Sequence, residues 1–275
     1  MAGHERIDPT ERAHLRDDVG YTPPIFRYTP AAELAGLVRR YWIPVWALPP
    51  GRSTVQRVLQ YPVCLLVVSH DYSVMVGVTT GLGRQELAGE GWAVGAMLQP
   101  AAGAMLLGGP VSQLTDRRVP LEDVPGLDGA ALTGRVRAAM SEAPTAESAH
   151  RAAITHVEDA LRKLGPVDEE GLLVNDIVAH VEQRSDVQRV AQICAELGMG
   201  QRALQRLTAR RIGLSPKWLV QRRRLHEAAE RLRAGAKVDL AAVAADLGYA
   251  DQAHFTRDFR AVTGLTPGAF AAQWR

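Results

Sequence analysis

The pattern of apolar positions divides the chain into two parts. Between about residues 25 and 128, apolar residues occur in short runs separated by glycine and proline, which is typical of β-strands. We expect strands at residues 54–59, 63–68, 73–78, 91–98 and 104–107. From residue 129 onward, apolar residues recur every three or four positions, which predicts helices. A chain of 275 residues is long enough for two domains, so we expect an α+β protein with a β-barrel or sandwich followed by a helical domain.

One segment of the helical part occurs twice. Leu-Gly-Met at 197–199 precedes Gly-Leu-Ser-Pro at 213–216, and Leu-Gly-Tyr at 247–249 precedes Gly-Leu-Thr-Pro at 264–267. In each copy the first glycine permits a turn between two helices. The Ser-Pro or Thr-Pro pair then begins another helix, because Ser and Thr cap helices and Pro loses no hydrogen bond at the first helical position. The repeat therefore predicts two helix-turn-helix units.

A helix from about residue 216 to 234 is expected to link the two units. Its apolar stripe faces inward, and we expect at least one or two guanidinium groups of the three consecutive arginines at 222–224 to face outward. A rigid connection would fix the spacing of the two units. This matters for DNA, because two recognition helices must lie about 34 Å apart to enter successive major grooves.

Basic charge is concentrated in the same part of the chain. Residues 187–275 contain 15 Lys and Arg against 7 Asp and Glu, whereas the rest of the chain contains 17 against 23. A basic solvated surface is the plainer interpretation of this charge alone. Beside a repeated helix-turn-helix, it favours a double-stranded DNA partner, since phosphate contacts supply much of the affinity for nucleic acid.

The repeat resembles the DNA-binding domain of AraC-type bacterial transcriptional regulators. The resemblance covers residues 169–275 and is carried by residues 198–216 and, more strongly, by Gly-Tyr-Ala-Asp-Gln-Ala-His-Phe at 248–255 with the Gly-Leu-Thr-Pro that follows. It implies a domain in which both units insert a recognition helix into the major groove of an asymmetric site.

The resemblance also implies which side chains read bases. By position these are Arg202, Gln205, Arg206, Gln252, Ala253, His254, Thr256 and Arg257. Arg suits guanine and Gln suits adenine through paired hydrogen bonds. A phosphate contact, a solvated face or an ion pair remains open for each arginine, and a capping or packing role remains open for Gln252 and His254.

Two positions of the first unit depart from the family pattern. Gly200 stands where Ser or Thr commonly caps the first recognition helix. Thr208 stands where a core aromatic is usual, whereas the second unit keeps Phe259. The first unit is therefore expected to be the looser reader of DNA.

The β-rich part carries a weaker resemblance. Tyr-Trp at 41–42 and Leu-Gln-Tyr-Pro at 59–62 are similar to the effector domain of an AraC subgroup, which implies a cupin-like β-barrel that binds a small molecule. The candidate pocket residues are Trp42, Trp46, Arg57, Tyr61 and Met97. Aromatic and Met side chains suit an apolar effector, and Arg57 suits a carboxylate or phosphate. An ordinary core, with Arg57 in a surface ion pair, is the alternative.

No catalytic or metal site is expected. His70 is the only histidine between residues 20 and 149, whereas a metal-binding cupin needs about three His or Glu ligands. There is no Gly-x-Ser-x-Gly elbow, Walker loop or Cys-x-x-Cys motif. We therefore expect no enzyme activity and no cofactor.

The remaining segments complete a division into an arm at 1–24, an effector domain at 25–128, a helical connector and linker at 129–168 and a DNA-binding domain at 169–275. The two connector helices are expected either to form a dimer or to pack on the barrel. Cys64 and Cys194 are expected to be buried thiols in a reducing compartment, and no apolar run is long enough to span a membrane.

These inferences predict a cytoplasmic bacterial transcription regulator with DNA, a small-molecule effector, RNA polymerase and a second copy of the chain as expected partners. Two alternatives stay open. In the first, the β-rich domain serves assembly without a ligand; in the second, the chain is an enzyme with an appended DNA-binding domain.

Overall fold

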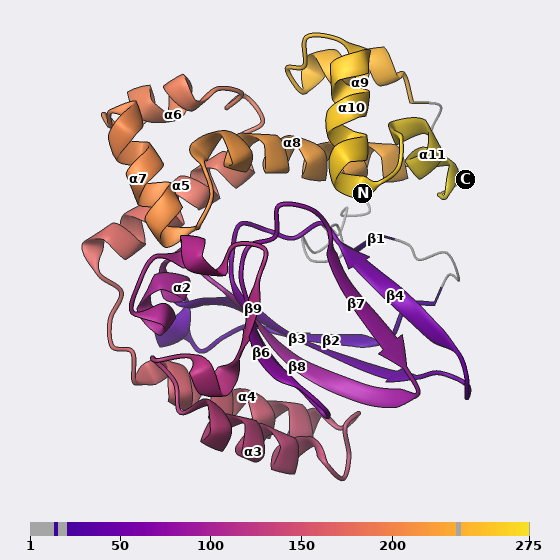
Figure 1. Ribbon diagram of the computed structural model, residues 1–275, viewed down its shortest axis with the longest axis vertical. Coiled ribbons are helices and arrows are strands. Elements are labelled where there is room, and N and C mark those ends of the chain that lie inside the picture. Colours follow the sequence, from indigo (N-terminus) through magenta and orange to yellow (C-terminus); the bar gives the residue numbers. More distant parts are fainter. Residues whose placement is uncertain (1–13, 16–20, 235–237, 275) are drawn as a thin grey trace, which may run out of the picture.

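The computed structural model describes residues 14–15, 21–234 and 238–274. A β-rich domain precedes a helical domain, which lies across one end of it (Figure 1). Most of the arm expected at 1–24 lies outside the described residues. Of that segment, His14–Leu15 forms the short strand β1, which pairs with β4.

The β-rich domain contains two antiparallel sheets. In the larger sheet the strand order is β2(Ile25–Tyr28), β3(Val38–Ala47), β8(Glu90–Leu98), β5(Leu65–Ser69), β6(Ser73–Val76) and β9(Arg118–Pro120). In the smaller sheet β4(Ser53–Val58) lies between β1(His14–Leu15) and β7(Gly83–Ala88). The expected strands at 54–59, 63–68, 73–78 and 91–98 correspond to β4, β5, β6 and β8. The remaining strands have no counterpart among those expected; in β7, for example, Leu87 is the one buried residue, so the apolar pattern is weak.

The strand expected at 104–107 is wrong, because these residues end the helix α2(Pro100–Leu107). Pro100 occupies the first helical position, where its missing N–H has no partner to lose, and Gly108 forms the left-handed C-cap. A short apolar run does not by itself distinguish a buried helix from a strand. Short 3-10 turns at Ala32–Leu34, Val111–Leu114 and Leu121–Asp123 connect the other elements.

The connector helices α3(Gly129–Met140) and α4(Glu147–Arg162) pack on the outer face of the larger sheet, at the end of the molecule opposite the helix-turn-helix units (Figure 1). Leu132, Val136 and Met140 are fully buried in the same core as the strands. Buried His150 of α4 lies 2.6 Å from the Tyr28 hydroxyl on β2. The apolar stripes of these helices are thus covered within the chain itself.

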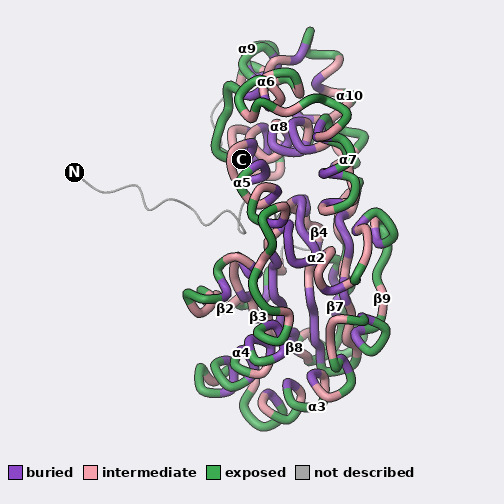
Figure 2. The backbone as a smooth tube through the Cα atoms, turned by 90° about the vertical axis from the view of Figure 1, so that its left-hand side faces the viewer, coloured by how far each residue is buried: buried purple, intermediate pink, exposed green. Residues whose placement is uncertain are grey.

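The helices of the C-terminal domain correspond to the two copies of the repeated segment. Its helices are α5(Glu169–Gln183), α6(Val190–Glu196), α7(Gln201–Arg211), α8(Pro216–Arg233), α9(Leu240–Asp246), α10(Gln252–Thr263) and α11(Pro267–Ala272). The pairs α6–α7 and α9–α10 are the two helix-turn-helix units, and α8 links them. Figure 1 shows α7 and α10 at opposite ends of α8, and Figure 2 shows α8 as largely buried between more exposed helices.

Candidate nucleic-acid interface

The recognition helices α7 and α10 begin in different ways. Asp251 caps α10, since its carboxylate accepts a hydrogen bond from the His254 backbone N–H at 2.7 Å. The equivalent N-cap of α7 is Gly200, which has no side chain to accept such a bond. The first turn of α7 therefore has less local support than the first turn of α10.

Most of the base-reading candidates lie on the exposed face of their helix. On α7, Arg202, Gln205 and Arg206 are exposed, while the neighbouring Leu204 and Leu207 are buried. None of these three polar side chains has a hydrogen bond or ion pair with the part of the chain that the structure describes. They are therefore available to an external partner.

The candidates on α10 divide into exposed and half-buried residues. Gln252, Ala253 and Arg257 are exposed, whereas His254 and Thr256 are partly buried. The His254 ring packs edge-on against Tyr249 at 5.2 Å and lies 3.8 Å from an Asp258 carboxylate oxygen. His254 thus has a packing role within the domain, as well as an edge that faces outward.

A hollow of about 480 Å³ lies between the two recognition helices. Gln205 of α7 and His254 of α10 both line it, which brings one predicted contact from each unit to the same surface. The hollow is also lined by Arg189, Lys217, Gln221 and Arg224, which sequence reasoning did not select. The family pattern concerns the recognition helices, so it gave no signal for these residues of α8 and of the segment before α6.

Of the three arginines at 222–224, Arg224 is partly exposed and lines this hollow, whereas Arg222 and Arg223 are buried. Arg222 is 2% exposed and donates to the backbone oxygens of Thr79, Thr80 and Gly81 at 3.0, 2.7 and 3.3 Å. Burial lowers the pKa of Arg222 to about 10. Arg222 is buried because the loop between β6 and β7 covers this part of α8, a contact that the helix's own periodicity does not reveal.

The two neighbouring arginines are also held within the protein. Arg223 is buried, donates to the Val187 backbone oxygen at 3.1 Å and pairs with Glu227 at 2.8 Å. Arg224 is half-buried and donates to the Gln188 backbone oxygen at 2.7 Å. Both side chains therefore fix the segment between α5 and α6 against α8.

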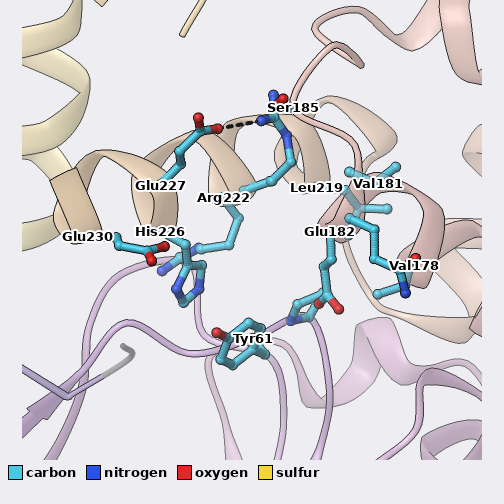
Figure 3. A pocket seen from close by; sticks show the side chains of 13 residues that line it. Tyr61, Val178, Val181, Glu182, Ser185, Leu219, Arg222, His226, Glu227 and Glu230 are labelled. Atoms are coloured by element: carbon cyan, nitrogen blue, oxygen red, sulfur yellow. Dashed lines mark hydrogen bonds and ion pairs between the residues drawn. The ribbon is translucent and has the colours of Figure 1, made fainter. Parts of the chain in front are cut away.

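A cavity of about 480 Å³, lined by charged, aromatic and aliphatic side chains, lies where the two domains meet (Figure 3). Tyr61 of the β-rich domain stacks on His226 of α8, with the ring centroids 4.3 Å apart. Glu182 of α5 pairs with Arg39 of β3 at 2.9 Å, and burial raises the pKa of Glu182 while Arg39 opposes this shift. Charged and aromatic contacts therefore hold the domains together around this cavity.

A second cavity, of about 410 Å³, lies between the two sheets of the β-rich domain. Trp42, Trp46, Tyr61 and Met97 all line it, so the structure brings four of the five pocket candidates together. Arg57 does not line it, because β4 directs Gln56 inward and Arg57 to the opposite face of the sheet. Tyr61 lines both this sheet cavity and the cavity between the domains.

The thiols differ in burial. Cys64 is buried, and burial raises its pKa to about 12, whereas Cys194 on α6 is only partly buried. Among the described residues, no helix is long and apolar enough to cross a membrane, and no group of three His, Cys, Asp or Glu side chains is arranged to hold a metal ion.

Two family models match the chain. Residues 193–273 match a helix-turn-helix domain, and residues 26–120 match a domain of unknown function (DUF6597). The first match and the paired units make the chain a DNA-binding transcription regulator. Its doubled helix-turn-helix domain is of the AraC type.

Solved structures of ToxT from Vibrio cholerae also match the chain. An apo variant from strain SCE256 shares 13% identity at a TM-score of 0.42, with 86% of this chain and 98% of that chain covered. ToxT from strain O395 bound to (E)-4-(8-methylnaphthalen-1-yl)but-3-enoic acid shares 11% identity at a TM-score of 0.41, with 86% and 99% covered.

Proposed function

We propose that this regulator binds a promoter element through α7 and α10, and that its β-rich domain binds a small molecule that alters this binding. The proposed DNA contacts are Arg202, Gln205, Arg206, Gln252, Ala253, His254, Thr256 and Arg257. The proposed units are an effector domain at 25–128, a connector at 129–168 and a DNA-binding domain at 169–275, preceded by an arm at 1–24.

The observation that carries the DNA-binding part is the availability of three arginines on two equivalent helices. Arg202 and Arg206 on α7 and Arg257 on α10 are exposed, and none has an ion pair with the residues that the structure describes. Other arginines of the domain, such as Arg210 and Arg211, are paired with acidic side chains of its first helix. Unpaired guanidinium groups on recognition helices are suited to guanine edges and phosphates.

The sensing part is supported by the position of the sheet cavity. Its lining includes Tyr61 and Thr79, and these two residues contact His226 and Arg222 of the linking helix α8. A molecule that binds better when this loop and α8 are in one arrangement would shift the domains toward that arrangement. The cavity also favours sensing over a role in assembly alone, because an assembly domain needs no hollow interior.

The further elements of the proposal follow from the DNA partner. We place the regulator in the cytoplasm, where promoter DNA and RNA polymerase are present, and assign it no catalytic role. Assembly with a second copy of the chain is included, because many regulators of promoters bind as dimers.

The test is binding of the purified chain to its own upstream intergenic DNA and to a scrambled duplex, titrated over salt. We expect preference for the upstream fragment and a steep loss of affinity as salt rises. Arg206→Ala and Arg257→Ala should each weaken specific binding by about 1–3 kcal/mol if they read bases, and should weaken binding to both duplexes alike if they hold phosphate.

A matched control separates these contacts from a general loss of positive charge. Arg135 is exposed on α3, at the end of the molecule opposite the recognition helices (Figure 1). Arg135→Ala removes the same charge and should leave the affinity for both duplexes unchanged. If it weakens binding as much as Arg257→Ala, the proposed interface is wrong.

A further inference from the structure

Two tryptophan side chains line one side of the sheet cavity. Trp42 and Trp46 lie four residues apart on the same face of β3 and are opposite Gly95 and Gly91 of β8 in the strand register. A Cβ atom at Gly95 would lie 2.3–2.6 Å from three ring carbons of Trp42, and one at Gly91 would lie 2.5–2.7 Å from two ring carbons of Trp46. The two indole rings therefore lie directly against the backbone of β8, which only glycine permits at these positions.

The Trp46 indole ring is held in place by further contacts. The Trp46 indole N–H donates to the Ala88 backbone oxygen at 3.2 Å, and His70 packs edge-on against its ring at 5.6 Å. Two aromatic rings that line one cavity favour a planar ligand that stacks on them, because stacking adds to the free energy of burying apolar surface.

The charge at the rim of the cavity is positive. Arg84, Arg117 and Arg118 lie there with one acidic residue, Asp116. The Asp116 carboxylate accepts hydrogen bonds from the backbone N–H and the hydroxyl of Thr80, both at 2.7 Å. Each of its oxygens therefore already has a hydrogen-bond partner within the protein. This balance favours an anionic ligand and disfavours a cation.

Arg118 is the rim cation that faces the cavity. It lies opposite Val76 in the register of β6 and β9, and Val76 lines the cavity. Arg84 also lies at the rim, but on β7 it alternates with Gly83 and Gln85, which line the cavity from the inward face of that strand. Arg118 has no hydrogen bond or ion pair with any residue in the described ranges.

We infer that the sheet cavity binds a planar aromatic anion, which stacks on Trp42 and Trp46 while its acidic group pairs with Arg118. This inference rests on the proposed sensing function and adds the chemical class of the ligand. Arg118 takes the role that the sequence suggested for Arg57.

Two fluorescent probes of matched shape test the ligand class. The first is 8-anilinonaphthalene-1-sulfonate, an aromatic anion, and the second is N-phenyl-1-naphthylamine, which has the same rings without the sulfonate. We expect the full chain to bind the anion more tightly. Arg118→Gln should weaken binding of the anion roughly tenfold, the effect of losing one charge-assisted hydrogen bond, and should leave binding of the neutral probe unchanged.

Two control variants locate the binding. Arg57→Gln removes a neighbouring cation that lies outside the cavity and should change neither affinity. Ala93→Leu adds carbon atoms to a buried position in the cavity lining and should weaken both probes. Circular dichroism and thermal unfolding of each variant separate these effects from loss of the fold.

The inference is overturned if Arg118→Gln and Arg57→Gln have equal effects, or if Ala93→Leu leaves anion binding intact. If both probes bind equally in the cavity and Arg118→Gln has no effect, the ligand class is wrong while the cavity remains a binding site. If neither probe binds, the inference fails together with the main support for sensing. The DNA-binding proposal is unaffected in each case, because the upstream DNA titration tests it separately.

Discussion

The two helix-turn-helix units come from one repeated sequence, yet different contacts complete their cores. In the first unit, Leu204 and Leu207 share a core with Val78 and Ala101 of the β-rich domain. At the position where the second unit has Phe259, the first has Thr208, which is also fully buried. The first unit thus relies on the neighbouring domain for apolar contacts that an aromatic side chain supplies in the second.

The core of the second unit is a chain of aromatic rings. Phe255, Phe259, Phe270 and Trp274 follow one another with centroid separations of 5.8, 5.4 and 6.4 Å. From the β-rich domain, the fully buried Leu59 joins this core, and the partly buried Leu82 packs against it. The comparison shows that duplicated units diverge when one of them packs against a neighbour, and it suggests that a change in the β-rich domain reaches the first unit more directly.

The largest effect is expected when the aromatic ring of Phe259 is removed. Phe259→Ala should lower the free energy of unfolding by about 3–5 kcal/mol, because Phe259 is fully buried between two other rings. Thr208→Ala, at the equivalent position, should cost about 1 kcal/mol, since it removes one weak hydrogen bond and little volume. Urea unfolding of both variants measures the difference. Equal losses would show that the second unit does not depend on its aromatic core.

A smaller difference is expected at the glycine that ends each recognition helix. Gly213 and Gly264 both have positive φ, at 87° and 76°, so alanine costs about 1–2 kcal/mol at either position. A Cβ at Gly213 would also lie 2.5 Å from the Thr115 hydroxyl oxygen and 3.0 Å from the Val111 backbone oxygen, whereas none of the described atoms lies within 4 Å of one at Gly264.

Gly213→Ala should therefore destabilise the protein by about 1–3 kcal/mol more than Gly264→Ala, the usual cost of overpacking. The extra cost should appear as faster amide exchange at residues 111–115, where the two domains touch. Similar exchange in both variants would mean that the first unit is not anchored there.

The third prediction concerns alkaline pH. Burial raises the pKa of Tyr249 in the second unit to about 12, above its ordinary value of 10.0. A raised pKa means that the neutral phenol is favoured in the folded state, so stability is full below pH 10 and falls as pH rises toward 12. The first unit has Met199 at the equivalent position, which does not titrate.

Tyr249→Phe should remove this loss, on the order of 2 kcal/mol between pH 10 and 12. At pH 7 the substitution should be nearly neutral, because the buried Tyr249 hydroxyl has no hydrogen-bond partner among the described residues. Unfolding free energies of both proteins across this pH range provide the test. Parallel curves would contradict it.

The smallest expected effect is at the N-caps. Asp251→Ala should destabilise the second unit by about 1 kcal/mol, since it removes the bond to the His254 N–H. Gly200→Asp should stabilise the first unit by a few tenths of a kcal/mol by supplying the cap that it lacks. Thermal unfolding of the two variants, compared with the parent chain, measures both the expected loss and the expected gain of stability. A gain from Asp251→Ala would exclude a capping role for this residue.

Local signals in the sequence were sufficient to predict the helices and turns of the helical domain. The Gly turns and the Ser-Pro and Thr-Pro starts depend on neighbouring residues only, and they predicted the two units and the linking helix correctly. The exposed faces of α7 and α10 also followed from periodicity, because Leu204 and Phe255 mark the opposite, buried face. These features depend on backbone geometry and on the spacing of apolar residues, which a sequence displays directly.

Contacts between distant segments decided the rest. Arg222 looked solvent-exposed on an isolated helix, but the loop at 79–81 covers it, about 140 residues away in sequence. The register of β3 against β8 places two tryptophans on two glycines, and the strand alternation directs Arg118 inward and Arg57 away. Helical periodicity and capping act over a few residues, whereas a cavity and a domain interface arise only when remote strands and loops meet, and that is set by tertiary packing.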